Sequence, residues 1–406
     1  MMNIHRNVIL RKTITFLLSF LKNGIIKRDC ILFSPVSNMI YSGNVKYLFE
    51  HLSSNQIDDC YWYTNDIRIK KYLDEKKYKY ITSSHPFHMI WILLKTKIVF
   101  SDGDDYINTF ELIHDINTIK IYLGHGQGPK TTLEKDNPMN TEEDQIKRIH
   151  KFDLVNIPSN DSMRFIGEDM YKLPKNKLIN IGYPRCDQFH TKKTDNSKNL
   201  LNELTENYSN IDSKLILYTP TWRPYVQDLP LLDMHGLSLN KFNDWLVARN
   251  IFFLFTLHPY SEMNIKKSDM NSNIIFVDTS KHPFFDIHEL MLETDILLND
   301  YSTTSIDFAL LNRPQIFFMP DYDIFNERKG FVGNYRNEMP GIEVKEYTDF
   351  IIKLENILSK RDAYINKYKQ KSDNILYKYY DMEHSSSIIS FYILTKDILK
   401  KQKKEQ

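Results

Sequence analysis

The chain has 406 residues and an almost even balance of charge, with 53 Lys and Arg against 52 Asp and Glu. This length is enough for two to three domains of about 150 residues each, and 42% apolar residues exclude a mostly disordered chain. A net charge of only +1 excludes a dedicated nucleic-acid binder, which would carry a strongly basic domain. The cysteines Cys30, Cys60 and Cys186 are too few and too scattered for a disulfide framework or a zinc site, so we expect a reduced, cytoplasmic compartment.

The first residues mix apolar side chains with Lys and Arg. The longest uncharged run, Thr13 to Leu21, has nine residues, far fewer than the ~20 that span a bilayer. No small-residue cleavage site of a signal peptide follows. We expect residues 1–28 to form a basic amphipathic helix on an anionic membrane surface, and the alternative is an ordinary helix packed on the N-terminal domain. At the other end, residues 385–406 are predicted to form a closing helix with a basic tail.

Short apolar runs alternate with helical stretches along the rest of the chain. Strands are predicted at residues 31–34, 97–100, 119–123, 154–157, 215–218, 252–257, 274–277, 296–298 and 315–318, and helices at 45–52, at 87–94, after 347 and from 385. Strands that are apolar throughout are typical of parallel sheets buried on both faces. The pattern predicts the α/β class, with two doubly wound domains at residues 29–190 and 214–384 facing a cleft. The polar segment 190–213 is the predicted boundary.

The first candidate site is a glycine-rich segment around His125. The strand predicted at 119–123 runs directly into Gly-His-Gly-Gln-Gly-Pro-Lys, which ends at Lys130. Glycines such as Gly126 let the backbone approach a ligand closely, and Pro129 favours a helix start whose amides attract an anion. His125 is predicted to act as a general base, because histidine exchanges its proton near neutral pH. A structural turn with a solvent-facing histidine is the alternative.

Two further segments carry an arginine after a turn. In Gly-Tyr-Pro-Arg-Cys-Asp, Arg185 and Asp187 are expected to orient each other or a substrate. Thr221 and Arg223 follow the strand at 215–218, and a guanidinium matches the geometry of phosphate oxygens. The alternative for Arg223 is a surface side chain stacked on Trp222.

A second histidine, His258, ends the strand predicted at 252–257. It is expected to donate to a pyrophosphate oxygen or to help the leaving group, and the alternative is a hydrogen-bonded histidine in the domain wall. His85, His282 and His288 lack comparable surroundings and are predicted to be structural.

The longest candidate segment follows the strand at 296–298 and precedes an apolar helix. Hydroxyls and unpaired amides at a helix N-terminus form a phosphate site that needs little positive charge. Asp300 is expected to bind a substrate hydroxyl or to hold the loop, while N-capping by Ser302 is compatible with ligand binding. The polar side chains of this segment are Asn299, Asp300, Ser302, Thr303 and Thr304. An acidic turn at residues 102–105 has the form of a Mg²⁺ site, but such turns are common and we predict no metal.

Taken in order, these segments resemble the CDP-glycerol glycerophosphotransferase family, which contains teichoic-acid primases and polymerases. The family's ordered motifs match residues 123–130, 182–187, 218–223, 258–259, 299–303 and 313–314, and residues 322–330 and 339–341 are similar to its closing loop. The sequence departs from the family at Gln127-Gly128, where the family has Thr-Pro, and at Asn299, where it has Thr. Several ordered motifs together are far more specific than any one of them.

The resemblance implies a GT-B fold at the cytoplasmic face of the cell membrane. It implies transfer of glycerol phosphate, or a related polyol phosphate, from a CDP-activated donor to a lipid-linked sugar or a growing teichoic-acid or capsule polymer, without a cofactor. The implied residues are His125 and His258 in catalysis, Lys130, Thr221, Arg223, Asp300, Ser302, Thr303 and Thr304 on the donor phosphates, and Gly126, Arg185 and Asp187 in support. The alternatives are a GT-B glycosyltransferase that uses a CMP- or UDP-sugar in capsule or lipopolysaccharide synthesis, and an inactive scaffold of a polymer-synthesis complex.

Overall fold

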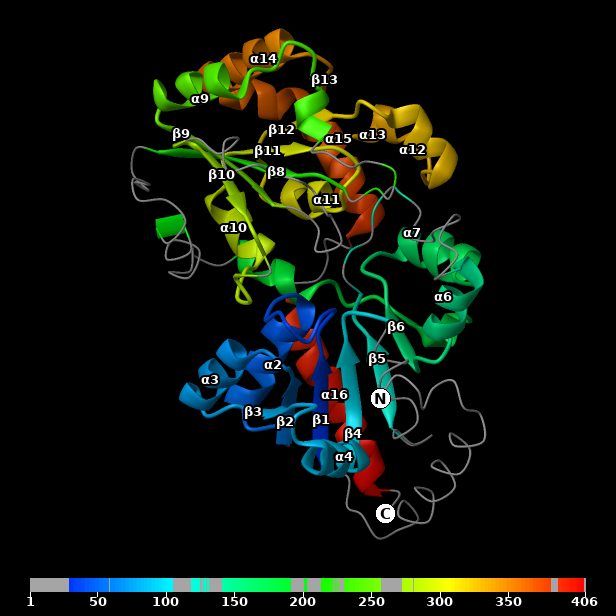
Figure 1. Cartoon of the computed structure of the whole chain (residues 1–406). Helices are drawn as coiled ribbons and strands as arrows, with labels where there is room; N and C mark the ends of the chain where they lie inside the picture. Colours follow the sequence, from blue (N-terminus) through cyan, green and yellow to red (C-terminus); the bar gives the residue numbers. More distant parts are fainter. Residues whose placement is uncertain are drawn as a thin grey trace.

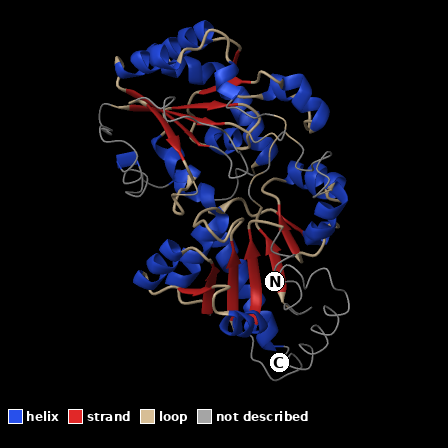
Figure 2. Ribbon diagram, in the orientation of Figure 1, coloured by secondary structure: helices blue, strands red, loops and turns tan. Residues whose placement is uncertain are grey.

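Two parallel sheets form the framework of the computed structural model (Figure 1), and helices cover the faces of each sheet (Figure 2). The structure describes residues 29–57, 59–104, 118–124, 126, 128, 130, 141–190, 201–202, 213–221, 223, 225, 230–256, 272–279, 281–380 and 386–404. The predicted fold class, two α/β domains with parallel sheets, is confirmed. The helix predicted at residues 1–28 and most of the predicted boundary segment lie outside the described residues.

The N-terminal domain contains a seven-stranded sheet in the order β3-β2-β1-β4-β5-β6-β7, with every neighbouring pair parallel. Its strands are β1 (Cys30–Ser34), β2 (Asp59–Tyr63), β3 (Lys79–Ile81), β4 (Thr96–Ser101), β5 (Ile119–Tyr122), β6 (Leu154–Asn156) and β7 (Leu178–Ile179). Its helices are α2 (Asn44–Ser54), α3 (Ile67–Glu75), α4 (Pro86–Lys95), α6 (Glu142–Ile149), α7 (Asn160–Ser162), the π-helix η1 (Met163–Met170), and the 3₁₀ turns η2 (Lys175–Lys177) and η3 (Pro184–His190).

The C-terminal domain contains a six-stranded parallel sheet in the order β10-β9-β8-β11-β12-β13. Its strands are β8 (Lys214–Thr219), β9 (Ile251–Thr256), β10 (Ile274–Val277), β11 (Ile296–Asn299), β12 (Gln315–Phe318) and β13 (Ile342–Val344). Its helices are the 3₁₀ turn η4 (Pro230–Asp233), α9 (Leu239–Val247), α10 (Ile287–Glu293), α11 (Thr304–Ala309), α12 (Tyr322–Arg328), α13 (Tyr335–Glu338), α14 (Tyr347–Ser359) and α15 (Arg361–Tyr379).

Both sheets change winding direction beside their first strand. The chain leaves β1 toward β2 and β3 and then returns to β4 on the other side of β1, and β8 and β11 repeat this pattern. In open α/β sheets, ligands bind beyond the carboxyl ends of the strands at such a switch point. The fold therefore predicts that a ligand binds near the loops after β1, β4, β8 and β11.

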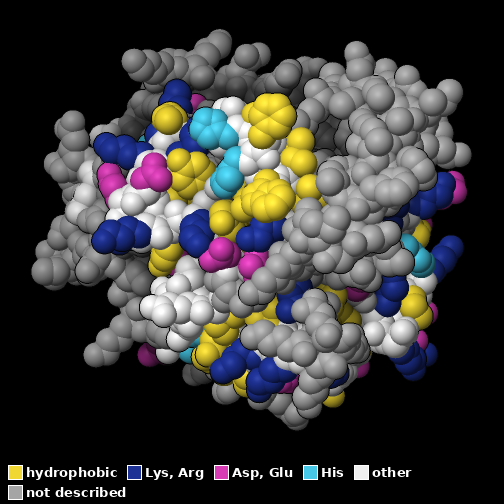
Figure 3. Space-filling model, turned by 90° about the horizontal axis from the view of Figure 1, so that it is seen from below, with side chains coloured by type: hydrophobic (Ala, Val, Ile, Leu, Met, Phe, Trp, Pro, Cys, Tyr) yellow, Lys and Arg dark blue, Asp and Glu magenta, His cyan; other side chains and the backbone are white. Residues whose placement is uncertain are grey.

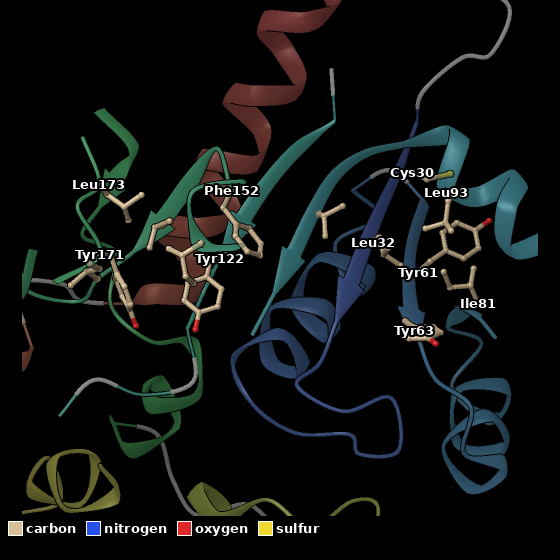
Figure 4. Packing of buried hydrophobic residues seen from close by; sticks show 14 of the residues in the cluster. Cys30, Leu32, Tyr61, Tyr63, Ile81, Leu93, Tyr122, Phe152, Tyr171 and Leu173 are labelled. Carbon is tan, nitrogen blue, oxygen red and sulfur yellow. The ribbon is translucent and has the colours of Figure 1, made fainter. Parts of the chain in front are cut away.

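The core explains why a central strand such as β1 is apolar along most of its length. In β1 all five residues are buried, because helices cover both faces of the sheet. On one face, Leu32 and Tyr61 pack with Leu93 of α4, and farther along the same face Tyr122 lies beside Phe152 (Figure 4). On the other face, Phe33 packs with Phe49 and other residues of α2.

The last helix, α16 (Ser387–Lys404), returns to the N-terminal domain. Its side chains Phe391 and Leu399 belong to the core cluster of α2 and β1. The described chain therefore crosses between the two domains twice, once after η3 and once before α16 (Figure 1). Among the helices described, none is sufficiently long and apolar to span a membrane.

Candidate active site

The glycine-rich loop after β5 lies against the start of α11 in the other domain. A Cβ atom placed on Gly126 would lie 2.8 Å from Thr303 Oγ1, and one on Gly128 would lie 2.6 Å from Thr303 Cγ2. These distances leave no room for a side chain, and Gly126 also has a φ of +143°, which side chains disfavour. The two segments that the sequence analysis singled out on separate domains therefore meet in the structure.

Lys130 is placed by the closing loop of the C-terminal domain. It forms an isolated antiparallel bridge with Phe331, which follows α12. Phe331 in turn stacks on Tyr335, with ring centroids 4.9 Å apart. The glycine-rich loop thus contacts the C-terminal domain at two places, Thr303 and Phe331.

Hydroxyl groups gather at the switch point of the C-terminal sheet. Thr219, at the end of β8, has its Oγ1 2.8 Å from Thr304 Oγ1 and donates to Asn299 Oδ1 at 3.0 Å. Thr304 donates to Ser302 Oγ at 3.0 Å. Ser302, Thr303 and Thr304 are all half-buried, so their hydroxyls are accessible to a ligand at the carboxyl edge of the sheet. The predicted hydroxyl cluster therefore occupies the position where α/β folds bind ligands.

Asp300 holds the loops of this switch point together. Its carboxylate accepts from the backbone N–H of Thr221 at 3.0 Å, from Thr221 Oγ1 at 2.7 Å and from the N–H of Tyr301. The residue is fully buried, and Tyr335 donates to its backbone carbonyl. Of the two roles expected for Asp300, this geometry supports holding the loop.

Arg223 lies differently from the expectation that it binds phosphate. Its Nη2 is 2.7 Å from Asp300 Oδ2 and its Nε is 2.8 Å from Asp321 Oδ2, while the guanidinium stacks over Tyr301 at 4.8 Å. Only 3% of the residue is exposed. Burial by itself lowers the pKa of Arg223, but the two carboxylates outweigh it and the net shift is upward. The guanidinium already pairs with both carboxylates, which supports an indirect, positioning role for Arg223.

Arg185 crosses from the N-terminal domain to a buried carboxylate of the other domain. Its Nη2 and Nε lie 3.0 and 3.2 Å from Asp307 Oδ2 in α11. The same carboxylate is 2.8 Å from His288 Nε2 and also accepts from Tyr380 OH. Burial alone raises the pKa of Asp307, but Arg185 and His288 outweigh it and lower this pKa to about 2. The network fixes α11 relative to the N-terminal domain.

Asp187 does not face Arg185 as expected. It caps α16 instead, accepting from Ser386 Oγ at 2.8 Å and from the N–H groups of Ser387 and Ile388 at 2.9 and 2.8 Å. A carboxylate is favoured at this place because the first amides of a helix have no partners within the helix. Arg185 and Asp187 thus anchor two different elements.

Two of the predicted site residues lie outside the residues that the structure describes. They are His125 and His258, so their predicted catalytic roles stay predictions. In the acidic turn after β4, Asp102 Oδ2 accepts from the N–H of Val45, and Asp104 pairs with Arg148 at 2.7 Å. Within the described ranges, no group of three His, Cys, Asp or Glu side chains has the spacing of a metal site.

The polar side chains that join the domains were not predicted from the sequence. Lys46 Nζ in α2 lies 2.6 Å from Glu289 of α10 and 3.4 Å from Asp286, the N-cap residue of that helix, and Tyr47 donates to Asp286 at 2.7 Å. The one signal in the sequence was Asp307, an acidic residue within an otherwise apolar helical segment. Nothing local to Lys46 marks it, because its partners are more than 200 positions away.

Comparisons with known proteins agree with this architecture. The family model for CDP-glycerol:poly(glycerophosphate) glycerophosphotransferase matches residues 14–394. A teichoic acid glycerol-phosphate primase of Bacillus subtilis is 26% identical over 77% of this chain and 78% of its own length. A teichoic acid poly(glycerol phosphate) polymerase of the same organism is 26% identical over 87% of this chain, which spans only 47% of that relative.

A solved structure of the wall teichoic acid polymerase TagF has the same fold. The two superpose with a TM-score of 0.75 at 20% identity, covering 98% of this chain and 96% of the compared chain. The family match extends over both sheets and includes every segment described above, from the glycine-rich loop to the hydroxyl cluster. The chain belongs to the CDP-glycerol:poly(glycerophosphate) glycerophosphotransferase family.

Proposed function

We propose that this protein transfers glycerol phosphate, or a related polyol phosphate, from a CDP-activated donor to a hydroxyl of a lipid-linked sugar or a growing cell-surface polymer. The observation that carries the proposal is the contact between the loop of Gly126 and Gly128 and Thr303 at the start of α11. It brings the segment that contains His125 to the hydroxyl cluster at the switch point. A base and a phosphate site would then face the same substrate.

In the proposed reaction, the acceptor hydroxyl oxygen attacks the β-phosphorus of the donor. A new phosphorus–oxygen bond forms, the bond to the bridging oxygen breaks, and CMP leaves with that oxygen. His125 takes the proton of the hydroxyl, and His258 assists the departure of CMP. Phosphoryl transfer depends mainly on positioning and on stabilisation of charge, so hydroxyl and amide donors fixed in place are suitable groups.

The donor phosphates are assigned to Ser302, Thr303, Thr304 and Lys130. In this proposal Thr221, Arg223 and Asp300 act indirectly, because their polar atoms already bind one another and hold the loops. Arg185 acts in the same way through Asp307. Burial supports this division for Arg223 and Asp300, which are enclosed, whereas Ser302, Thr303 and Thr304 are half-buried. Thr221 is also half-buried, but its hydroxyl donates to Asp300.

We place this activity at the cytoplasmic face of the cell membrane, in teichoic-acid or capsule synthesis, as a peripheral protein. The support is the basic and apolar sequence of residues 1–28 and the names of the relatives, a teichoic acid polymerase and a teichoic acid primase.

The test is release of CMP from CDP-glycerol, with and without membrane extract as the acceptor. We expect acceptor-dependent release and a product in which ³¹P NMR detects a phosphodiester. His125→Ala should lower the rate by about 10²–10⁴, the usual contribution of a general base. His190→Ala, at an exposed position at the end of η3, is the matched control and should keep the wild-type rate.

Other outcomes would contradict the proposal in different ways. Release from a CMP- or UDP-sugar with a glycosidic product would identify a glycosyltransferase. Failure of a folded protein to turn over CDP-glycerol, CDP-ribitol and nucleotide sugars would identify a scaffold. A folded His125→Ala variant with wild-type turnover would remove His125 from the role of base.

A further inference from the structure

Two buried asparagine side chains bind consecutive carbonyl groups at the end of β5. Asn44, in the first turn of α2, donates through Nδ2 to the carbonyl of Gly124 at 2.6 Å. Asn156, the last residue of β6, donates through Nδ2 to the carbonyl of Leu123 at 3.3 Å. Both asparagines are fully buried. The chain is therefore fixed by two different elements directly before His125, which follows Gly124 in the sequence.

Of these two hydrogen bonds, the one from Asn44 is the closer to the proposed base. The carbonyl of Gly124 belongs to the peptide group that joins Gly124 to His125, and a peptide group is planar, so a donor on this carbonyl restricts the whole group. Gly124 has a φ of +76°, and a Cβ atom on it would lie 3.6 Å from Tyr122 and 3.7 Å from the hydroxyl of Tyr183. The turn at Gly124 and the amide of Asn44 together set the direction in which the chain leaves β5.

The amide of Asn44 also binds a second segment of the candidate site. Its Oδ1 accepts from the backbone N–H of Arg185 in η3 at 3.2 Å. A primary amide has both donors and an acceptor, so one side chain can bind a carbonyl and an N–H at once, which a carboxylate or an apolar side chain cannot do. Beside it, Asp102 Oδ2 accepts from the N–H of Val45 at 3.1 Å. Burial raises the pKa of Asp102 to about 7, and hydrogen bonds from Val45 and Asn44 oppose this rise.

These contacts close a ring that passes through both parts of the candidate active site. Arg185 Nη2 lies 3.0 Å from Asp307 in α11, and the start of α11 contacts the glycine-rich loop through Thr303. The glycine-rich loop in turn begins at the carbonyl that Asn44 binds. Asn44 therefore binds directly to the segment of the proposed base and, through Arg185 and Asp307, to the helix of the hydroxyl cluster.

The ring lies where the carboxyl edge of the N-terminal sheet faces the C-terminal domain (Figure 1). Figure 3 views the molecule from the opposite end, where hydrophobic, histidine and basic side chains are exposed. Because Asn44 is fully enclosed at the other edge, a substitution there leaves this outer surface unchanged.

We propose that Asn44 is a positioning residue for the transfer reaction, which orients the peptide group between Gly124 and His125 and thereby sets the place of the base relative to the hydroxyl cluster. Asn44 is enclosed and touches neither donor nor acceptor, so loss of its amide should lower kcat and leave the affinity for the donor unchanged. The inference rests on the proposed function, because it needs His125 to be the base.

The test is a double-mutant cycle of Asn44→Ala and His125→Ala in the full chain, with CMP release from radiolabelled CDP-glycerol and membrane extract as the acceptor. We expect Asn44→Ala alone to lower kcat about 10–100-fold, the effect of displacing a reacting group by about 1 Å. In the His125→Ala background the same change should lower the remaining rate less than about twofold, because a residue that acts through the base has no further effect once the base is absent. The Kd of CDP-glycerol, measured by isothermal titration calorimetry, should stay within about twofold of the wild-type value.

The matched control is Asn273→Ala. Asn273 is 9% exposed and donates through Nδ2 to the carbonyl of Ile251 at 2.8 Å, but both residues lie at the amino edge of the C-terminal sheet, away from the ring. This variant should lose a comparable hydrogen bond, seen as a lower urea midpoint, and keep the wild-type kcat. If Asn44→Ala does not fold, Asn44→Ser takes its place in the cycle, because serine keeps a polar group beside Asp102 but is one atom shorter than asparagine.

Three outcomes would overturn the proposal. Equal losses from the Asn44 substitution with and without His125 would show that Asn44 does not act through the base. A weaker Kd of CDP-glycerol with an unchanged kcat would place Asn44 in donor binding, and a wild-type rate of the folded variant would remove it from the reaction. A failure of the proposed function is seen separately, because His125→Ala would then keep the wild-type rate by itself.

Discussion

At the scale of single residues, the most consequential group is the carboxylate of Asp307. It binds Arg185, His288 and Tyr380 at once, in a fully buried position between the domains. A buried carboxylate is costly unless it is paired and hydrogen-bonded. Removal of any one of these three partners would therefore leave the buried charge of Asp307 with fewer hydrogen bonds and would destabilise the native state.

His288 should make the stability of this protein depend on pH. Burial lowers the pKa of His288, but hydrogen bonds to Asp286 and Asp307 outweigh it and the net shift is upward. A raised pKa means that the native state binds the proton more tightly than the unfolded state. The stabilisation is therefore complete below the unfolded value of about 6.5 and is lost as the pH rises through the native value.

We expect His288→Gln, which keeps a donor but cannot be charged, to lower the free energy of unfolding by about 1.5–3 kcal/mol at pH 6, the usual worth of a hydrogen bond to a charged group. The difference between wild type and variant should shrink as the pH is raised to 8.5. Urea unfolding at several pH values measures this difference, and the other titrating groups cancel in the comparison. A difference that stays constant over this range would mean that His288 is neutral in the native protein.

At the scale of elements, the contact between the glycine-rich loop and the start of α11 depends on the size of the side chains at positions 128 and 303. Gly128 has no positive φ, so its requirement is for space alone. The nearest obstacle to a Cβ is the methyl carbon of Thr303 at 2.6 Å, and the next is Thr303 Cβ at 3.4 Å. Serine at position 303 would remove the first obstacle and keep the hydroxyl.

We expect Gly128→Ala to lower kcat/KM by about 10–100-fold, because a displacement of the order of 1 Å between reacting groups has effects of this size. Adding Thr303→Ser to the same chain should restore most of the loss. Steady-state CMP release measures both. Gly103→Ala is the control, since a Cβ there would lie 3.5 Å from Val36 Cα, an ordinary contact. If the double variant is no better than Gly128→Ala, the two segments do not meet in the active protein.

At the scale of the whole molecule, the relative position of the domains is fixed by buried polar contacts. Lys46 lies between Asp286 and Glu289, and Arg185 pairs with Asp307. The N–H of Tyr41 also donates to the carbonyl of Pro283 at 2.7 Å. Charged groups fit together in few arrangements, so these contacts select one orientation in which the glycine-rich loop reaches α11.

Lys46→Met should therefore destabilise the protein by about 3–5 kcal/mol, because two buried carboxylates lose their cation. Lys79→Met is the matched control: its ion pair with Asp59 is also short, at 2.5 Å, but the side chains are 53% and 42% exposed, and the loss should stay below about 1 kcal/mol. Urea unfolding measures both, and small-angle X-ray scattering should show a larger radius of gyration for Lys46→Met alone. Coincident unfolding curves of the two variants would contradict the role of Lys46.

Elements with a strong local pattern could be predicted from the amino-acid sequence alone. The strands predicted at residues 274–277 and 315–318 are β10 and β12 to the residue, because β10 is a run of four apolar residues and β12 has three after Gln315. The helix predicted at 87–94 is α4, extended by one residue at each end. The strands β2, β3, β7 and β13 were missed: β3 and β13 have three residues each and β7 has two, and β2 begins with Asp59. Runs this short or mixed carry little periodicity.

The order of motifs along the chain also determined the family, and the loops that carry Ser302 and Thr303 were found from the sequence. The partners of the charged side chains, in contrast, could be identified only in the folded protein. Arg223 was expected at the donor phosphates, but its guanidinium pairs with Asp300, and Asp300 has the contacts of the loop-holding role that was one of its two expected roles. Asp187 was expected beside Arg185 or a substrate, but it caps a helix 200 positions away. The reason is physical: burial and ion pairing depend on which elements meet in space, and residues such as Lys46 and Asp286 acquire their partners only when the two domains come together.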